Sequence, residues 1–253
     1  MNTQPSMTNK VVLVVGGAGS IGAAAARLFA SLGARVAISH RDEPKEAAAA
    51  ADLVTTLPGA GHAALVADVA QTTTLAALRA EIERHYGRLD VLVNAAGFTR
   101  PVPHADLDAL DDELIHKMFA VNWRGQFATI RTFAPLLKAS GDGLIVSISS
   151  IAGTNGIGSS IAYCAVKAGI DVMTKSLARV LAPEVRVLAV APGVVDTGFV
   201  PGRGADFNAK TAATTPLQRV ATADDIASAI LACATQLGFA TGTTFVVDGG
   251  RSL

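Results

Sequence analysis

The feature that most constrains the fold of this chain is an alternation of short apolar segments with longer, alanine-rich amphipathic segments. Val11–Val15 is an unbroken apolar run of strand length, and Ile21–Leu32 has the periodicity of a helix that ends at Gly33. An apolar run without polar alternation is typical of a strand that is buried on both faces. The alternation therefore predicts a parallel sheet between two layers of helices.

The pattern continues along the whole chain. Further strands are expected at Arg35–Ser39, His62–Ala67, Leu89–Asn94, Leu144–Ser149, Val185–Val190 and Thr243–Val247. Further helices are expected at Lys45–Thr56, Thr73–Tyr86, Asp108–Ala139, Ser160–Ala182 and Ala223–Ala234. These elements predict an α/β fold: a Rossmann-like, doubly wound, seven-stranded and mostly parallel sheet with helices on both faces.

We expect residues 1–253 to form a single nucleotide-binding domain, because no linker, repeat or low-complexity stretch divides them. The least regular part is Pro192–Pro216, which is rich in Gly, Pro and Thr. In doubly wound sheets, ligands bind beyond the carboxyl ends of the strands. Since this segment follows a predicted strand, we expect it to be a substrate loop that covers the ligand.

Charge and composition exclude several functions. The formal net charge is +0, whereas a nucleic-acid-binding protein carries a basic excess. Gly143–Val166 has no charged residue, but its many Ser, Gly, Thr and Asn residues make it too polar to span a membrane. The first ten residues lack the pattern of a signal peptide. We therefore expect a cytoplasmic protein that binds neither nucleic acid nor membrane.

The cysteines and histidines indicate neither a disulfide framework nor a metal site. Cys164 and Cys233 are too few to staple a chain of 253 residues, and we interpret them as free thiols. The 5 histidines show no metal-ligand spacing. No metal is expected.

A glycine-rich turn follows the first predicted strand. Gly17, Gly19 and Gly22 fit G-x-G-x-x-G, while Gly16, Gly19 and Gly22 also fit G-x-x-G-x-x-G. Glycine lets the backbone approach a pyrophosphate closely, and the dipole of the following helix favours the anion. The candidate phosphate-binding residues are Gly16, Gly17, Gly19, Ser20, Ile21 and Gly22.

The tip of the second strand bears on cofactor choice. An acid there would accept a hydrogen bond from a ribose 2′-hydroxyl and favour NAD(H). Here the tip is His40, followed by Arg41 and Asp42. Arg41 can pair with a 2′-phosphate, so the sequence favours NADP(H), with NAD(H) left open through Asp42.

Candidate catalytic residues follow later strands. Tyr163 and Lys167 are four residues apart and share one face of a helix. A nearby ammonium is expected to lower the pKa of the tyrosine, which suits proton transfer near neutral pH. Ser150 lies just past a strand end, thirteen residues before Tyr163.

With these residues in place, the chain resembles the short-chain dehydrogenase/reductase family over nearly its whole length. The matching features, in order, are the turn at Gly16–Gly22, Asp68-Val69, Asn94-Ala95-Ala96-Gly97, Asn122, Ser149-Ser150, Tyr163 with Lys167, Pro192-Gly193 with Thr197, and Val247-Asp248-Gly249-Gly250. Two positions depart from the family pattern: Val15 replaces a usual threonine and Ser20 a frequent glycine. Both lie in or beside the phosphate turn.

The resemblance implies roles for the catalytic candidates. Tyr163 would give a proton to a carbonyl oxygen or take it from an alcohol. Lys167 would bind the nicotinamide ribose, and Ser150 would hold the substrate oxygen. Asn122 would support a water that relays protons to Lys167.

It also implies a cofactor site. Asp68 and Val69 would contact the adenine. Asn94, Ala95, Ala96 and Gly97 would line the dinucleotide near its ribose. Tyr163 and Lys167 would adjoin the nicotinamide, and Pro192, Gly193, Val195 and Thr197 would cup its carboxamide.

We therefore expect an NAD(P)-dependent oxidoreductase that acts on a small carbonyl or alcohol, such as a 3-oxoacyl or ketone reductase. A sugar, polyol or cyclic-alcohol dehydrogenase using NAD stays open, as do, more remotely, a non-catalytic nucleotide sensor and an epimerase or dehydratase. The resemblance also implies a homotetramer. The expected specificity residues are small and apolar, which favours a mostly uncharged substrate; they are Phe98, Thr99, Ala152, Gly153, Asn155, Ile157 and the loop Val194–Pro216.

Overall fold

The computed structural model describes residues 6–253. Its core is one seven-stranded parallel sheet, with the strand order β3-β2-β1-β4-β5-β6-β7. The strands are β1 Val11–Val15, β2 Arg35–His40, β3 Ala63–Val66, β4 Val91–Asn94, β5 Gly143–Ile148, β6 Val185–Pro192 and β7 Thr244–Val247. The predicted doubly wound α/β fold is confirmed.

The strand order reverses next to β1, which lies between β2 and β4. Val15, the last residue of β1, is in register with Ser39 of β2 and Asn94 of β4. The loops that follow these three strands therefore meet at one edge of the sheet. Such a switch point is where a doubly wound sheet opens a crevice for a ligand.

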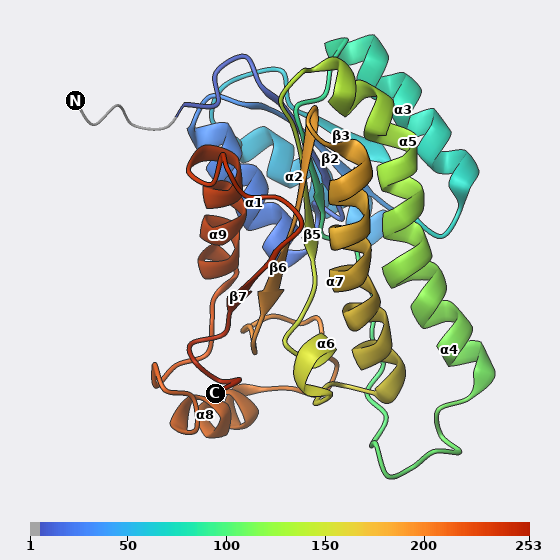
Figure 1. The fold of residues 1–253 in the computed structure, drawn as a ribbon, viewed down its shortest axis with the longest axis vertical. Helices are drawn as coiled ribbons and strands as arrows, with labels where there is room; N and C mark the ends of the chain where they lie inside the picture. Colours follow the sequence, from blue (N-terminus) through green and yellow to red (C-terminus); the bar gives the residue numbers. More distant parts are fainter. Residues whose placement is uncertain (1–5) are drawn as a thin grey trace.

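Helices cover both faces of the sheet (Figure 1). One layer consists of α1 Ser20–Ser31, α2 Pro44–Thr56 and α9 Ala223–Thr235. The other consists of α3 Thr72–Tyr86, α5 Gly125–Ala139 and α7 Ile161–Leu181. Each layer packs a separate hydrophobic cluster onto the sheet, because side chains of successive strand residues point to opposite faces.

The long helix predicted at Asp108–Ala139 begins later and has three parts. They are α4 Asp112–Phe119, a π-helical turn (η1) at Ala120–Arg124, and α5. The start was wrong because Asp111, not Asp108, caps the helix: its carboxylate accepts a 2.7 Å hydrogen bond from the N–H of Leu114.

Two short helices lie in segments that the sequence analysis left irregular. They are α6 Ala152–Asn155 and α8 Ala205–Ala213. The second corrects the prediction of an irregular loop over Pro192–Pro216, since the Gly- and Pro-rich flanks concealed nine helix-compatible residues. Figure 1 places α6, α8 and the C-terminus at the end of the molecule toward which β6 points.

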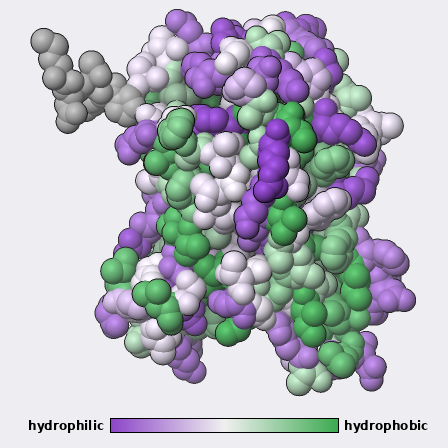
Figure 2. All heavy atoms as spheres, viewed as in Figure 1, coloured by the Kyte–Doolittle hydropathy of each residue, from purple (hydrophilic) through white to green (hydrophobic). Residues whose placement is uncertain are grey.

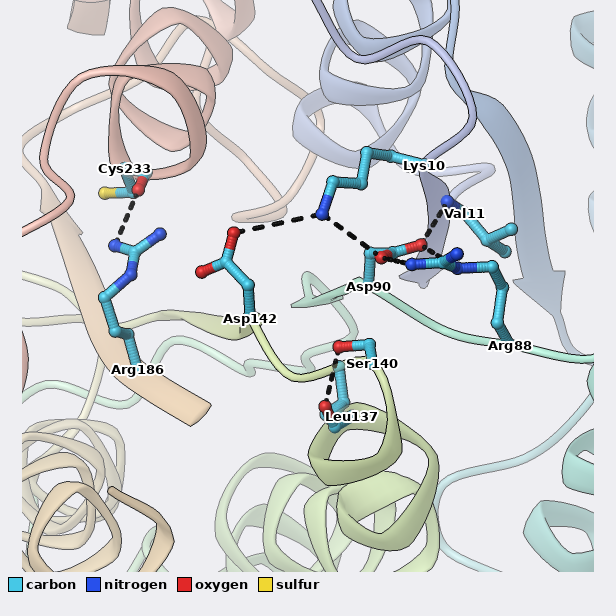
Figure 3. Close-up of polar contacts among 9 residues, drawn as sticks. All are labelled: Lys10, Val11, Arg88, Asp90, Leu137, Ser140, Asp142, Arg186 and Cys233. Atoms are coloured by element: carbon cyan, nitrogen blue, oxygen red, sulfur yellow. Dashed lines mark hydrogen bonds and ion pairs between the residues drawn. The ribbon is translucent and has the colours of Figure 1, made fainter. Parts of the chain in front are cut away.

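An ion-pair network stabilises the opposite, amino-terminal edge of the sheet (Figure 3). Asp90 is 1% exposed and accepts hydrogen bonds from the N–H of Val11 at 2.8 Å and from Arg88 at 2.6 Å. Lys10 lies 3.4 Å from the same carboxylate and 3.8 Å from that of Asp142. The network therefore ties together the residues that lead into β1, β4 and β5.

A membrane-spanning role finds no support in the helices of residues 6–253, since each is too short or too polar to cross a bilayer.

Candidate active site

Tyr163 and Lys167 lie one turn apart near the start of α7. Ser160 is the N-cap of this helix, and its hydroxyl accepts a hydrogen bond from the N–H of Tyr163 at 3.1 Å. The ammonium of Lys167 lies 5.5 Å from the centroid of the tyrosine ring. It is 3% exposed and donates a 2.7 Å hydrogen bond to the carbonyl of Ile148, the last residue of β5. The predicted pair is therefore brought together and fixed to the sheet.

Ser150 completes the cluster. It follows β5 by two residues, and its hydroxyl accepts a 3.2 Å hydrogen bond from the N–H of Ala152. The same hydroxyl lies near enough to the phenol of Tyr163 to lower the pKa of that phenol. A substrate oxygen placed here can contact two hydroxyl groups, one on the loop after β5 and one on α7.

Burial sets the protonation of this pair. Burial raises the pKa of Tyr163 to about 12, although the hydrogen bond from Ser150 and the charge of Arg203 act in the opposite direction. Burial also lowers the pKa of Lys167 to about 8, while Asp171 opposes that shift. The expectation that Lys167 lowers the tyrosine pKa is therefore wrong for the protein without cofactor, in which desolvation outweighs nearby charges.

Asn122 lies in the π-helical turn and is fully buried. Its carbonyl oxygen accepts from the N–H of Phe98 at 3.0 Å, and its amide donates to the carbonyls of Phe98 and Met118, both at 2.9 Å. Both amide hydrogens are thus used. The side chain fixes the loop after β4 to the turn, and its role in supporting a water stays a prediction.

The glycine turn after β1 is closely packed. Gly16 has φ +79°, and a Cβ there would lie 2.6 Å from the N atom of Ala96. A Cβ at Gly22 would overlap the carbonyl oxygen of Gly16. These positions therefore require glycine. Gly19, the N-cap of α1, provides no side-chain cap, so the first N–H groups of the helix are available to an anion.

The turn thus fits the pyrophosphate of a dinucleotide. Ser20 and Ile21 supply the first backbone groups of α1 at this end. Asn94 ends β4, and the following segment, Ala95–Gly97, packs against the turn through Ala96. Neither amide atom of Asn94 has a hydrogen-bond partner within residues 6–253, although the side chain is buried. A buried polar group of this kind requires a partner.

His40 ends β2 as predicted and is 8% exposed. Arg41 follows it with half of its side chain exposed. Its guanidinium forms ion pairs with Glu46 and, at 2.8 Å, with Glu43. The sequence analysis did not anticipate these two carboxylates, although both lie within five residues of Arg41.

Asp68 and Val69 follow β3 and differ in orientation. Asp68 accepts hydrogen bonds from the N–H of Ala70 at 2.8 Å and the amide of Gln71 at 3.1 Å. Val69 is 7% exposed and packs against Gly125, where a Cβ would lie 2.9 Å from its methyl group. The side chain of Val69 therefore belongs to the core, and an adenine ring could reach only its backbone.

The segment after β6 crosses the site. The N–H of Gly193 donates to Val247 at 3.0 Å, and Val195 forms a bridge with Ala221. The hydroxyl of Thr197 accepts from the N–H of Phe199 at 3.4 Å. The ring of Phe199 then lies 6.2 Å from that of Tyr163. The loop motif beginning at Pro192 therefore leads directly to Tyr163, the candidate proton donor.

Phe199 and Arg203 were not singled out from the sequence. Only their position within the predicted substrate loop could have suggested them, since neither belongs to a motif. Within residues 6–253, no group of three or more His, Cys, Asp or Glu side chains is placed to hold a metal ion.

Comparisons with known proteins agree with this geometry. Residues 16–252 match a family described as Enoyl-(Acyl carrier protein) reductase. The "Granaticin polyketide synthase putative ketoacyl reductase 2" of Streptomyces violaceoruber is 39% identical over 96% of both chains. The cis-4-hydroxycyclohexanecarboxylate dehydrogenase of Sinomonas cyclohexanicum is 37% identical over 97% of both chains.

A similar fold is known in Burkholderia xenovorans. The crystal structure of "a putative short-chain dehydrogenase/reductase" from that organism has a TM-score of 0.91 and 34% identity, covering 97% of this chain and 98% of the other.

The parallel sheet with a glycine turn at its switch point, and the Ser–Tyr–Lys cluster at its carboxyl edge, define a dinucleotide-binding α/β oxidoreductase. Its similarity to the proteins above extends along the chain. The chain belongs to the short-chain dehydrogenase/reductase family and is an NAD(P)-dependent oxidoreductase that acts on hydroxyl or keto groups.

Proposed function

We propose that this protein is a ketone reductase that uses NADPH and protonates the substrate through Tyr163. The observation that carries the proposal is the grouping of Tyr163 with Lys167, whose ammonium lies 5.5 Å from the tyrosine ring centroid, next to Ser150 on the loop after β5. Desolvation raises the pKa of Tyr163 to about 12. Such a phenol keeps its proton at neutral pH, so it is available as a donor. Reduction of a carbonyl needs a donor of this kind.

Each residue has a separate task in this proposal. Lys167 and the glycine turn would hold the nicotinamide dinucleotide, which would supply a hydride for the carbonyl carbon. Tyr163 gives its phenolic proton to the carbonyl oxygen, and the hydroxyl of Ser150 orients that oxygen. Lys167, anchored on Ile148, carries a positive charge next to the tyrosine and would bind the nicotinamide ribose.

The experiment is the reduction of a panel of cyclic ketones and 3-oxoacyl thioesters, followed by loss of NADPH absorbance. Tyr163→Phe should lower kcat by at least 100-fold and leave NADPH binding unchanged, because only the proton donor is removed. Full activity of this variant would contradict the role of Tyr163. Absence of turnover on every ketone and alcohol tested, with NADPH bound, would instead favour a nucleotide sensor.

The preference for NADPH rests on Arg41. Its side chain and that of Glu43 are each more than half exposed, and an ion pair of this kind is worth about 0–1 kcal/mol. A 2′-phosphate forms stronger, charge-assisted hydrogen bonds with an arginine. We therefore propose that the phosphate replaces Glu43 as the partner of Arg41, while Glu46 keeps the side chain in place.

Fluorescence titration with NADPH and NADH tests this preference. The wild-type protein should bind NADPH at least tenfold more tightly, about 1.4 kcal/mol, and Arg41→Ala should remove the difference. Arg84→Ala, an exposed arginine that pairs with Glu81 on α3, is the control. Equal binding of the two cofactors by the wild-type protein would contradict the role of Arg41 and indicate that Asp42 contacts the ribose.

A second function is favoured by one observation. Glu43 and Glu46 already neutralise Arg41, and Asp42 adds a further negative charge at the tip of β2. An acidic environment there disfavours a 2′-phosphate and favours NAD. The corresponding activity is oxidation of a cyclic alcohol, as in the name of the Sinomonas relative. Alcohol oxidation with NAD that exceeds ketone reduction with NADPH would select it.

We also propose a cytoplasmic homotetramer in which residues 1–253 act as one nucleotide-binding unit. Exposed apolar side chains support an interface: Val172 and Val180 on α7, and Val246 on the edge strand β7. Figure 2 views this side of the molecule, on which apolar and polar side chains alternate. Sedimentation equilibrium should give four times the mass of one chain, and localisation of a tagged protein tests the compartment.

A further inference from the structure

Phe199, in the segment between β6 and α8, forms one wall of the space next to Tyr163. The centroids of the two rings are 6.2 Å apart, and their planes are tilted by 52°. Two carbons of the same phenyl ring lie 3.6 Å from the position that a Cβ would take at Gly97, in the loop after β4. The phenylalanine is 40% exposed. A substrate that reaches the tyrosine can therefore pack against this ring.

The segment after β7, Asp248–Leu253, is bound to the end of α8, and Figure 1 shows the C-terminus beside that helix. One nitrogen of Arg251, Nη1, donates to neutral oxygens at the end of α8: the carbonyl of Thr211 at 3.3 Å, the hydroxyl of Thr214 at 3.1 Å and the hydroxyl of Thr215 at 3.3 Å. The N–H of Leu217 also donates to the carbonyl of Gly249 at 3.1 Å. These contacts fix the end of α8.

A tight turn directs Arg251 toward α8. The carboxylate of Asp248 accepts hydrogen bonds from the N–H groups of Gly250 at 2.9 Å and Ser252 at 2.8 Å. Gly250 has φ +85°, and a Cβ there would lie 2.9 Å from the Cγ of Pro216. Glycine is therefore required at this close approach. The motif Val247-Asp248-Gly249-Gly250, which the resemblance left without a role, builds this turn.

The same turn contacts the beginning of the segment after β6. The N–H of Gly193 donates to the carbonyl of Val247 at 3.0 Å, and a Cβ at Gly193 would lie 2.8 Å from that of Asp248. The stretch 193–215 is therefore held at both ends by residues that follow β7. Phe199 lies between the two fixed ends, so its position depends on both of them.

We propose that Arg251 is a positioning residue that keeps Phe199 next to Tyr163 by holding the end of α8. This inference rests on the proposed function and narrows its substrates to ketones that carry an apolar ring, which packs against the exposed part of the phenylalanine. Tyr163 and Lys167 lie on α7, outside the stretch 193–215. Loss of Arg251 should therefore weaken substrate binding and leave the chemical step intact.

The first test measures the segment itself and does not depend on turnover. Hydrogen–deuterium exchange of peptides covering 194–216 should be at least about fivefold faster in Arg251→Gln, with α7 unchanged. Gly250→Ala should have the same effect, because its methyl group would displace Pro216. Lys210→Gln removes an exposed charge from α8 itself and should leave exchange unaltered. Unchanged exchange in both Arg251→Gln and Gly250→Ala would overturn the proposal.

The second test compares the reduction of cyclohexanone and acetone with NADPH. Arg251→Gln should raise KM for cyclohexanone about tenfold, because the ring loses a positioned wall. Its kcat, and KM for acetone, should change by less than about twofold. Arg251→Lys, which keeps one donor group, should restore part of the loss, and Phe199→Ala should reproduce it.

Three outcomes would contradict the proposal or its premise. An equal rise in KM for both ketones would show that Arg251 does not act through the wall formed by Phe199. A fall in kcat with weaker NADPH binding would place its effect at the cofactor. Each of these overturns the proposal. Failure of the wild-type protein to reduce any ketone would contradict the proposed function, whereas hydrogen exchange would still decide whether Arg251 holds the segment.

Discussion

The ammonium of Lys167 donates a 2.7 Å hydrogen bond to the backbone carbonyl of Ile148, at the point where β5 ends. This is its one hydrogen bond to residues 6–253, so a buried cation is held by a single neutral oxygen. Charged groups are expensive to bury with so little compensation. The position of Lys167 therefore lowers the stability of the fold, as expected of the role that we propose for it in the reaction.

Lys167→Met should accordingly stabilise the protein without cofactor while abolishing reduction. The shift of the lysine pKa from 10.5 to about 8 corresponds to a cost of about 3 kcal/mol. The variant also leaves the Ile148 carbonyl without a hydrogen-bond donor, which destabilises the folded protein by about 1–2 kcal/mol. We expect a net gain of about 1–2 kcal/mol at pH 7, measured by urea unfolding.

The same gain should depend on pH. Below pH 8 the lysine is protonated in both the folded and the unfolded chain, so the full cost is present. As pH rises through about 8 toward 10.5, the folded protein loses the proton first and the cost decreases. The difference in the free energy of unfolding between Lys167→Met and the wild-type protein should therefore become smaller between pH 7 and 9. Lys175→Met, exposed on the same helix, should show no such trend; an identical trend would contradict the assignment.

The pH profile of ketone reduction should follow Lys167 and not Tyr163. The tyrosine pKa of about 12 keeps the proton donor intact throughout the usual range. Lys167 loses its charge near pH 8. With NADPH saturating, kcat should be constant from pH 6 to about 7.5 and fall above about 8. A rate that stays level to pH 10 would show that the cofactor, once bound, keeps Lys167 protonated.

Gly22→Ala should weaken NADPH binding by more than tenfold. The new methyl group would overlap the carbonyl oxygen of Gly16 and lie 2.9 Å from the Cα of Gly17, so the phosphate turn has to shift. Gly238→Ala is a matched control, because nothing lies within 4 Å of a Cβ at that position. Fluorescence titration measures the affinity, and circular dichroism shows that both variants fold. Unchanged affinity in Gly22→Ala would remove this turn from the cofactor site.

Asp90→Asn should lower the free energy of unfolding by about 2–4 kcal/mol. The carboxylate is 1% exposed and pairs with Arg88 and Lys10, so the neutral amide loses both charge interactions (Figure 3). Asp142→Asn should change stability by less than about 0.5 kcal/mol, because its side chain is 74% exposed and 3.8 Å from Lys10. Thermal unfolding compares the two; equal effects would contradict a structural role for Asp90.

The strands and helix ends that follow from residue periodicity could be predicted from the sequence. Apolar runs such as Val11–Val15 became central strands because both of their faces are buried, and helix stops such as Gly87 were visible as glycines. Features that depend on tertiary contacts were missed. The π-helical turn holds Asn122, whose side chain binds the backbone of Phe98, and this contact joins residues 24 positions apart.

The candidate site shows the same division. The positions of Ser150, Tyr163 and Lys167 were recognisable from spacing, and the structure brings them together. The direction in which the pKa of Tyr163 shifts could not be predicted from the sequence, because it depends on how much of the phenol is desolvated in the folded protein.

The Asp90 network has a consequence for how such a protein can diverge. It joins the amino-terminal ends of β1, β4 and β5, whereas every candidate catalytic group lies beyond the carboxyl ends of the strands. The residues that stabilise the sheet and the residues expected to contact the substrate thus lie at opposite ends of the strands. Substitutions in the loop after β6 can therefore change which substrate is accepted without disturbing the ion pairs that stabilise the fold.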